Sequence, residues 1–104
     1  MKYIMLESDE GHKIPVLFGD AFVHAHMAKY AADLARRSLG KSYDVANAGF
    51  VSVTRDGIAT FGKSESLGIK SNPIDGLRIE LGEAVSHMPD FMLPPMAEKL
   101  RKAR

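Results

Sequence analysis

The sequence predicts a single α+β domain with elements in the order β-β-α-β-β-α, in which an antiparallel sheet of about four strands packs on a central helix. Three observations support this prediction: a long helical segment over 20–40, two pairs of strand-like runs joined by turn residues, and a second helical pattern over 73–88. A chain of 104 residues has room for one core. We place the domain over residues 1–96 and a basic C-terminal tail over 97–104.

The first two strands are expected to form an N-terminal hairpin. Apolar runs over 3–6 and 13–18 flank Ser8-Asp9-Glu10-Gly11, whose residue types favour turns. Pro15 lies inside the second run and has no amide hydrogen to donate to a neighbouring strand. This strand is therefore predicted to lie at a sheet edge or to carry a bulge.

The central helix is predicted to run from Asp20 to Gly40. The Asp20 side chain suits the N-cap, and Gly40 can adopt the left-handed conformation that ends a helix. Arg36 and Arg37 place cations in the last turn, where the helix dipole favours them. Asp33 is spaced to form an ion pair with Arg37.

Two apolar stripes emerge when the side chains are placed at about 100° per residue. The large-residue stripe comprises Val23, Met27, Tyr30 and Leu34. The small-residue stripe comprises Ala21, Ala25, Ala28, Ala32, Ala35 and Leu39. Because the polar wedge is narrow, we expect the large stripe to cover the sheet. Close packing is expected along Ala25, Ala28 and Ala32, from this chain or another copy. The alternative is that these alanines are simply good helix formers and lie half exposed.

A second hairpin is predicted after the helix. Residues 50–54 favour a strand, Asp56-Gly57 is a hairpin turn signal, and residues 58–61 return as the partner strand. Gly49 is expected to mark a bulge at the start of this hairpin.

A second helix is predicted over 73–88. Asn72 and Pro73 are typical of a helix start, and apolar residues then recur at spacings of three and four as far as Met88. The alternative is a strand over 77–81, where polar and apolar residues alternate.

The segment that follows Pro89 is expected to be extended, because Pro94 and Pro95 disfavour a helix there. It should either fold back on its own domain or lie on a neighbour. Its candidate interface residues, which join those of the alanine stripe, are Phe91, Met92, Leu93 and Met96. The tail over 97–104 could add a helical turn or two.

One stretch matches a phosphate-binding loop letter for letter. Residues 57–64 fit G-x-x-x-x-G-K-[ST], which makes Gly62, Lys63 and Ser64 phosphate-site candidates. Such a loop needs a helix directly after the lysine. Here residues 57–61 favour a strand and a glycine follows soon after, so the sequence favours a hairpin followed by a loop.

No other pattern indicates a catalytic or metal site. His24 and His26 diverge by roughly 200° on a helix and cannot share a metal ion. His24 is expected to be a hydrogen-bonded interior or interface histidine, with a general base as the alternative. No nucleophile motif surrounds Ser64 or Ser66. We predict no catalytic residue, no metal and no cofactor.

Composition and charge are those of an ordinary globular protein, with 45% apolar residues, 26% charged residues and a net charge of +1. Nucleic-acid binding would therefore need local cations, and the candidates are Arg36, Arg37, Lys99, Arg101 and Lys102. The chain has no cysteine, no signal-peptide pattern and no apolar run that could span a membrane. A cytoplasmic protein of bacterial or phage origin is the default expectation.

Three functional hypotheses follow. The first is a small non-enzymatic interaction or assembly protein that forms a homo-oligomer, with a dimer favoured. The second is a nucleic-acid-binding accessory protein that uses the basic helix end and tail. The third is a small enzyme or nucleotide binder that uses His24 or the loop over 57–64.

Overall fold

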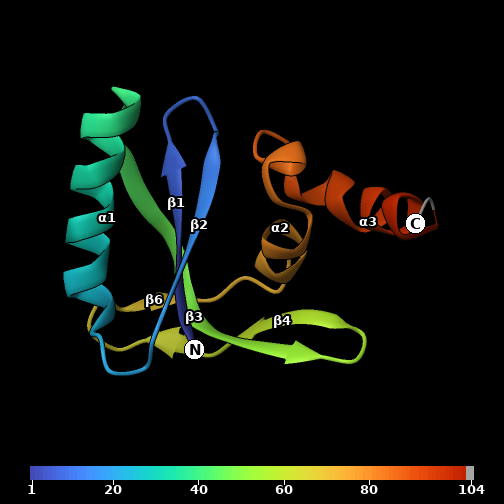
Figure 1. Ribbon diagram of the computed structural model, residues 1–104, viewed down its shortest axis with the longest axis horizontal. Coiled ribbons are helices and arrows are strands. Elements are labelled where there is room, and N and C mark those ends of the chain that lie inside the picture. The colour runs from blue at the N-terminus through green and yellow to red at the C-terminus, as the bar shows by residue number, and fades with distance from the viewer. Residues whose placement is uncertain (103–104) are drawn as a thin grey trace.

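The computed structural model describes residues 1–102 and has the predicted fold class, a small α+β domain (Figure 1). A four-stranded antiparallel sheet has the order β2-β1-β3-β4. Its strands are β1 (Lys2–Ser8), β2 (Lys13–Phe18), β3 (Tyr43–Thr54) and β4 (Gly57–Phe61). A short second pair comprises β5 (Lys63–Ser64) and β6 (Ile69–Lys70). The helices are α1 (His24–Leu39), α2 (Asp75–Leu81) and α3 (Leu93–Lys102), with 3-10 turns η1 (Gly82–Val85) and η2 (Asp90–Met92).

The sheet is covered on both faces, by α1 on one side and by α2 on the other (Figure 1). Ile4 and Leu6 pack with the alanines of α1, whereas Tyr3 and Met5 face the opposite cluster. All four side chains are fully buried. A central strand with helices on both faces has no solvent side, which explains why β1 is continuously apolar and does not alternate.

Both predicted hairpins are confirmed. β1 pairs with β2, and within residues 1–102 β2 has no strand on its other side, so Pro15 lies at a sheet edge as expected. β3 pairs with β4 across a turn that ends at Gly57, whose φ of 135° suits glycine.

β3 differs from the prediction in its length and in the position of its bulge. The strand begins at Tyr43, and its register against β1 shifts between Met5 and Leu6, opposite the middle of β3. The bulge is therefore not at Gly49. That glycine is needed for a close approach instead, because a Cβ there would lie 2.5 Å from the carbonyl oxygen of Phe61 and 2.9 Å from Cβ of Ser71.

α1 begins four residues later than Asp20, so the predicted N-cap is wrong. Val23 occupies the N-cap in an extended conformation and makes no side-chain capping bond. The Asp20 carboxylate instead lies 3.0 Å from the N-terminal amine. The predicted end is confirmed, because Gly40 has a φ of 70° and its amide donates to Arg36.

The second helix is confirmed over 77–81, where a strand was the alternative. The predicted start is wrong, because α2 begins at Asp75 with Ile74 at the N-cap and no side-chain capping bond. The side-chain oxygen of Asn72 accepts the amide hydrogen of Ile74 at 3.1 Å in the turn before the helix. α2 ends at Gly82, which has a φ of 68°, and is shorter than predicted.

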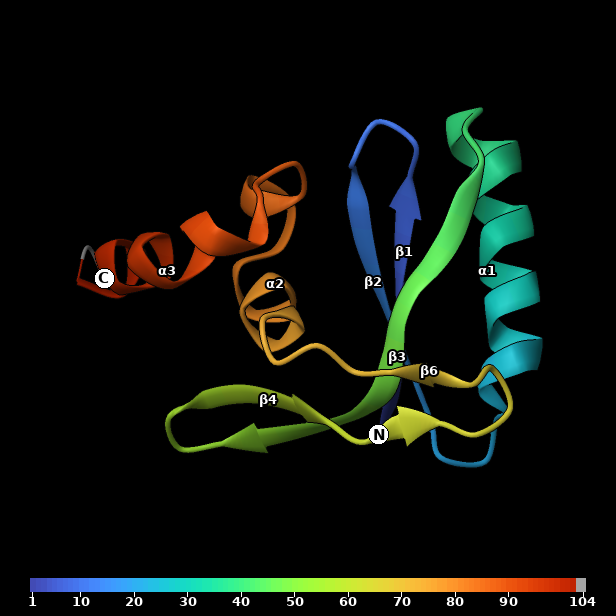
Figure 2. The same ribbon diagram turned by 180° about the vertical axis from the view of Figure 1, so that it is seen from behind.

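The prediction that residues 91–96 are extended is wrong. These residues form η2 and the first turn of α3. Pro94 and Pro95 lie in that first turn, where the backbone amides have no intrahelical partner to lose. α3 then projects away from the sheet (Figures 1 and 2).

Candidate interaction surfaces

The two stripes of α1 have the opposite orientation from the one predicted. The helix side chains that pack on the sheet are His24, Ala28, Ala31 and Ala35. In the large-residue stripe, which was predicted to be core, Val23 is 42% exposed, Tyr30 is 67% exposed and Leu34 is 49% exposed. The sheet face below α1 is already filled by large side chains such as Ile4, Leu6 and Phe18, so alanines let the helix approach closely.

The alanines proposed as interface residues are consequently covered by their own chain. Ala28 is buried in the core, and Ala25 and Ala32 are half-buried. The amide of Ala25 donates to the Ser66 hydroxyl at 3.1 Å, which ties the start of the helix to the β5–β6 loop. The free apolar surface of α1 is the large-residue stripe, of which Met27 is half-buried against the core.

A second apolar surface lies on α3. Leu93 and Ala97 are buried, so Leu93 is unavailable to a partner. Phe91 is 79% exposed, and with Met92 and Met96 it lines a groove of about 550 Å³. Lys99 and Lys102 border this groove.

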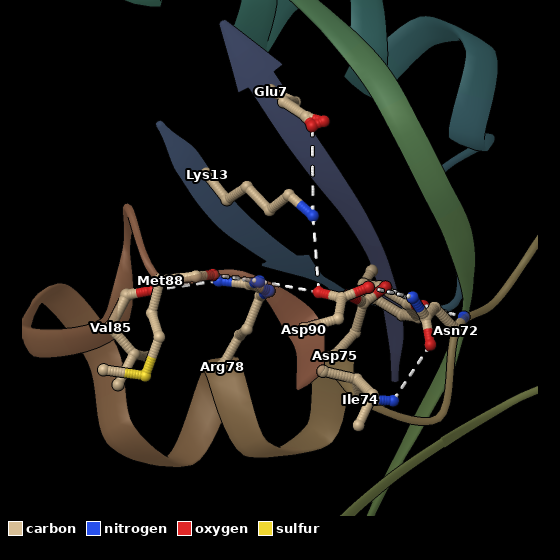
Figure 3. Close-up of polar contacts among 10 residues, drawn as sticks. Glu7, Lys13, Asn72, Ile74, Asp75, Arg78, Val85, Met88 and Asp90 are labelled. Atoms are coloured by element: carbon tan, nitrogen blue, oxygen red, sulfur yellow. Dashed lines mark hydrogen bonds and ion pairs between the residues drawn. The ribbon is translucent and has the colours of Figure 1, made fainter. Parts of the chain in front are cut away.

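A polar network fixes the segment that leads into α3. Arg78 is almost fully buried and donates to the carbonyl oxygens of Val85 at 2.9 Å and Met88 at 2.6 Å, and to the Asp90 carboxylate at 2.6 Å (Figure 3). Lys13 lies 3.5 Å from the same carboxylate. Burial alone would raise the pKa of Asp90, but the Arg78 hydrogen bond and the Lys13 charge bring it below its ordinary value.

Beside this network lies a buried carboxyl group, Asp75. Tyr3 donates its hydroxyl hydrogen to one carboxylate oxygen at 2.8 Å, and within residues 1–102 the other oxygen has no hydrogen-bond partner. Burial raises the pKa of Asp75 to about 6, and burial likewise raises the pKa of Tyr3. Asp75 is sealed from solvent, so it is placed to affect stability and not to contact a substrate.

The histidines do not assemble a metal or catalytic centre in the described part of the chain. His24 is buried and donates from Nε2 to the carbonyl oxygen of Gly49 at 2.8 Å, which is the interior role expected for it. His12 lies 2.7 Å from the Tyr43 hydroxyl and 3.3 Å from Glu83, and its ring stacks on His87.

Sequence reasoning missed this His12 cluster, because its members come from separate segments. No group of three or more potential metal ligands is present among residues 1–102.

The stretch that matches a phosphate-binding loop does not have that geometry. Residues 57–61 form β4, and Lys63 and Ser64 form β5 without a helix directly after them. Ser64 is buried, and its hydroxyl accepts the amide hydrogen of Leu67 at 3.1 Å. Lys63 is exposed and lies 3.7 Å from Glu65. Gly62 supplies a turn with a φ of 74°.

The basic residues proposed for nucleic acid do not form one surface. Arg36 and Arg37 both pair with Asp33, and Arg36 borders a groove of about 680 Å³ into which Asp33 and Asp44 bring negative charge. Lys99 and Lys102 lie on α3, on the far side of the sheet (Figure 1). The side chain of Arg101 and residues 103–104 lie outside the described part of the protein.

Comparison with protein families, with curated proteins and with solved structures finds no match to this chain. Within residues 1–102, no helix combines the length and apolar character that crossing a membrane requires.

Proposed function

We propose that this chain is a small non-enzymatic interaction or assembly protein that associates with copies of itself, most simply as a dimer. The observation that supports the proposal is the α1 stripe, defined here as Val23, Met27, Tyr30 and Leu34. Val23, Tyr30 and Leu34 are exposed on a helix that packs through alanines, and Met27 is half-buried between them. An exposed apolar surface of this kind is typical of a contact site.

The spacing of the α1 stripe favours a second copy as the partner. Its residues are separated by four, three and four positions, the spacing by which two helices interlock along a narrow seam. The stripe is uncharged, so it is complementary to itself and suits a contact around a two-fold axis. A cytoplasmic location is part of the proposal, since a chain without cysteine suits a reducing compartment.

Light scattering coupled to size-exclusion chromatography tests the association. The wild type should have the mass of a dimer, and Leu34→Glu should convert it to a monomer, because the charge would be buried in the seam. Val53→Glu is the matched control, since Val53 is 82% exposed on β3 and away from the stripe. A wild type that stays monomeric at high concentration would overturn the proposal. If Phe91→Glu dissociates the dimer and Leu34→Glu does not, the contact lies at the α3 surface instead of the α1 stripe.

The absence of cysteine allows a direct test of the contact. Tyr30→Cys places a single thiol near the middle of the stripe and should form an intermolecular disulfide under mild oxidation. Val53→Cys is at a more exposed position, 82% against 67% for Tyr30, and should not form this disulfide. Equal cross-linking of both variants would indicate random collision and contradict a stripe-to-stripe contact.

A further inference from the structure

A row of aromatic and basic side chains crosses one end of the sheet. Lys2 is opposite both Phe18 on β2 and Phe50 on β3, and Phe50 is opposite Phe61 on β4. Directly paired residues project from the same face of a sheet, so these four side chains lie side by side. The rings of Phe50 and Phe61 are stacked with centroids 5.8 Å apart. Phe61 is 51% exposed, so part of its ring faces solvent.

Cations gather around this aromatic pair. Lys2 and Lys63 line, together with Phe50, a groove of about 340 Å³. Lys63 is opposite Lys70 in the β5–β6 pair, so both exposed ammonium groups project from the same face of that pair. The N-terminal amine precedes Lys2 by one residue and is paired with Asp20, so it adds no free positive charge.

Negative charge at this end of the sheet is smaller. Asp20 pairs with the N-terminal amine, and Glu65 lies 3.7 Å from Lys63. Lys2 and Lys70 have no carboxylate within ion-pair distance among the described residues. This end of the sheet therefore has an excess of positive charge, although the net charge of the whole chain is only +1.

We propose that this end of the sheet, comprising Lys2, Phe50, Phe61, Lys63 and Lys70, binds single-stranded nucleic acid. An exposed ring beside lysines offers a stacking surface for a base and cations for the flanking phosphates. Only an unpaired strand presents base faces to such a ring. The site does not include the basic residues of α1 and α3. It adjoins the α1 stripe at Val23, which lines the same groove as Lys2, Phe50 and Lys63.

The absence of tryptophan provides a clean reporter. Phe61→Trp should bind oligothymidylate at low salt with quenching of its fluorescence, because a stacked base contacts the indole. Phe91→Trp is the matched control, because Phe91 is also exposed and lies beside Lys99 and Lys102. It should show no quenching. Quenching at position 91 and none at position 61 would overturn the proposal and assign binding to α3.

Two further variants separate stacking from charge. Phe61→Ala should weaken oligothymidylate binding by about tenfold or more and leave binding of heparin, a polyanion without bases, unchanged. Phe61→Tyr keeps an aromatic ring and should retain affinity, while unchanged heparin binding by Phe61→Ala excludes misfolding as the cause of its loss. Lys63→Gln should make the negative slope of log K against log salt shallower by about 0.7, because one phosphate contact is lost. Equal losses for heparin and oligothymidylate, or no binding of either at low salt, would overturn the proposal.

Discussion

Replacing Asp75 with asparagine should remove about 2 kcal/mol of pH-dependent stability between pH 4.5 and 7.5. The side chain is buried, and its pKa is raised to about 6 from an ordinary value of 3.8. A raised pKa means that the folded state favours the protonated carboxyl. The stability it contributes is therefore fully present below the unfolded pKa and is lost as the pH rises through the window from 3.8 to about 6.

The magnitude follows from the size of the shift. The difference between a pKa of 3.8 and one of about 6 corresponds to about 3 kcal/mol of stability lost at neutral pH. At pH 4.5 most of the unfolded population is already ionised at this position, so the wild type should be about 2 kcal/mol more stable than at pH 7.5 from this group alone. The asparagine side chain has no charge to titrate and can still accept the Tyr3 hydrogen bond.

Urea denaturation of both proteins at the two pH values measures the effect. The difference in unfolding free energy between wild type and Asp75→Asn should change by about 2 kcal/mol between pH 4.5 and 7.5. Tyr3→Phe is a second check, since it removes a hydrogen bond that favours the ionised carboxylate and should move the window to higher pH. An unchanged difference between wild type and Asp75→Asn at the two pH values would refute the assignment of the raised pKa to Asp75.

Two further predictions concern packing. Gly76→Ala should lower the unfolding free energy by about 2 kcal/mol, because a Cβ there would overlap the carbonyl of Ile58 on β4. In Gly19→Ala the added Cβ would point into open space, so the unfolding free energy should change by less than about 1 kcal/mol. Equal losses of stability for the two variants in thermal melts would contradict the close approach of Gly76 to Ile58. Asp90→Ala should cost about 2 kcal/mol or more by leaving the buried Arg78 guanidinium without its carboxylate. Limited proteolysis checks this, because Asp90→Ala should be cleaved faster than the wild type between η1 and α3. An unchanged cleavage rate would contradict the role of the Arg78 network in holding this segment in place.

The parts of the fold that could be predicted are those that local sequence determines. Residues 8–11 and Asp56-Gly57 specify turns by their own backbone preferences, and Gly40 ends α1 for the same reason. The orientation of α1 depends on a distant property, the size of the side chains that β1 places below it. Helical periodicity reports that two stripes exist and does not report which one meets a surface already filled by Ile4 and Leu6.

Parts of the C-terminal region and of the candidate surfaces could not be predicted for related reasons. Pro94-Pro95 is compatible with an extended segment and with the first turn of a helix, and only tertiary packing of Leu93 and Ala97 selects the helix. The row of Lys2, Phe50 and Phe61 comes from three strands, so it appears only when their registers are known. No spacing along the chain signals it.

β3 pairs with β1 along its first part and with β4 along its second part, and this determines how force would pass from the β3–β4 ribbon to the core. Its first part is paired with β1 as far as Phe50, and the Val51 amide donates to the Met1 carbonyl at 2.8 Å. Beyond Val51, in the described residues, β3 has β4 as its only strand neighbour. The β3–β4 ribbon is held a second time by α2, because Gly76 closely approaches the carbonyl of Ile58 on β4. A force applied to the ribbon would therefore reach the core by two routes, through the β1 pairing at Phe50 and through α2.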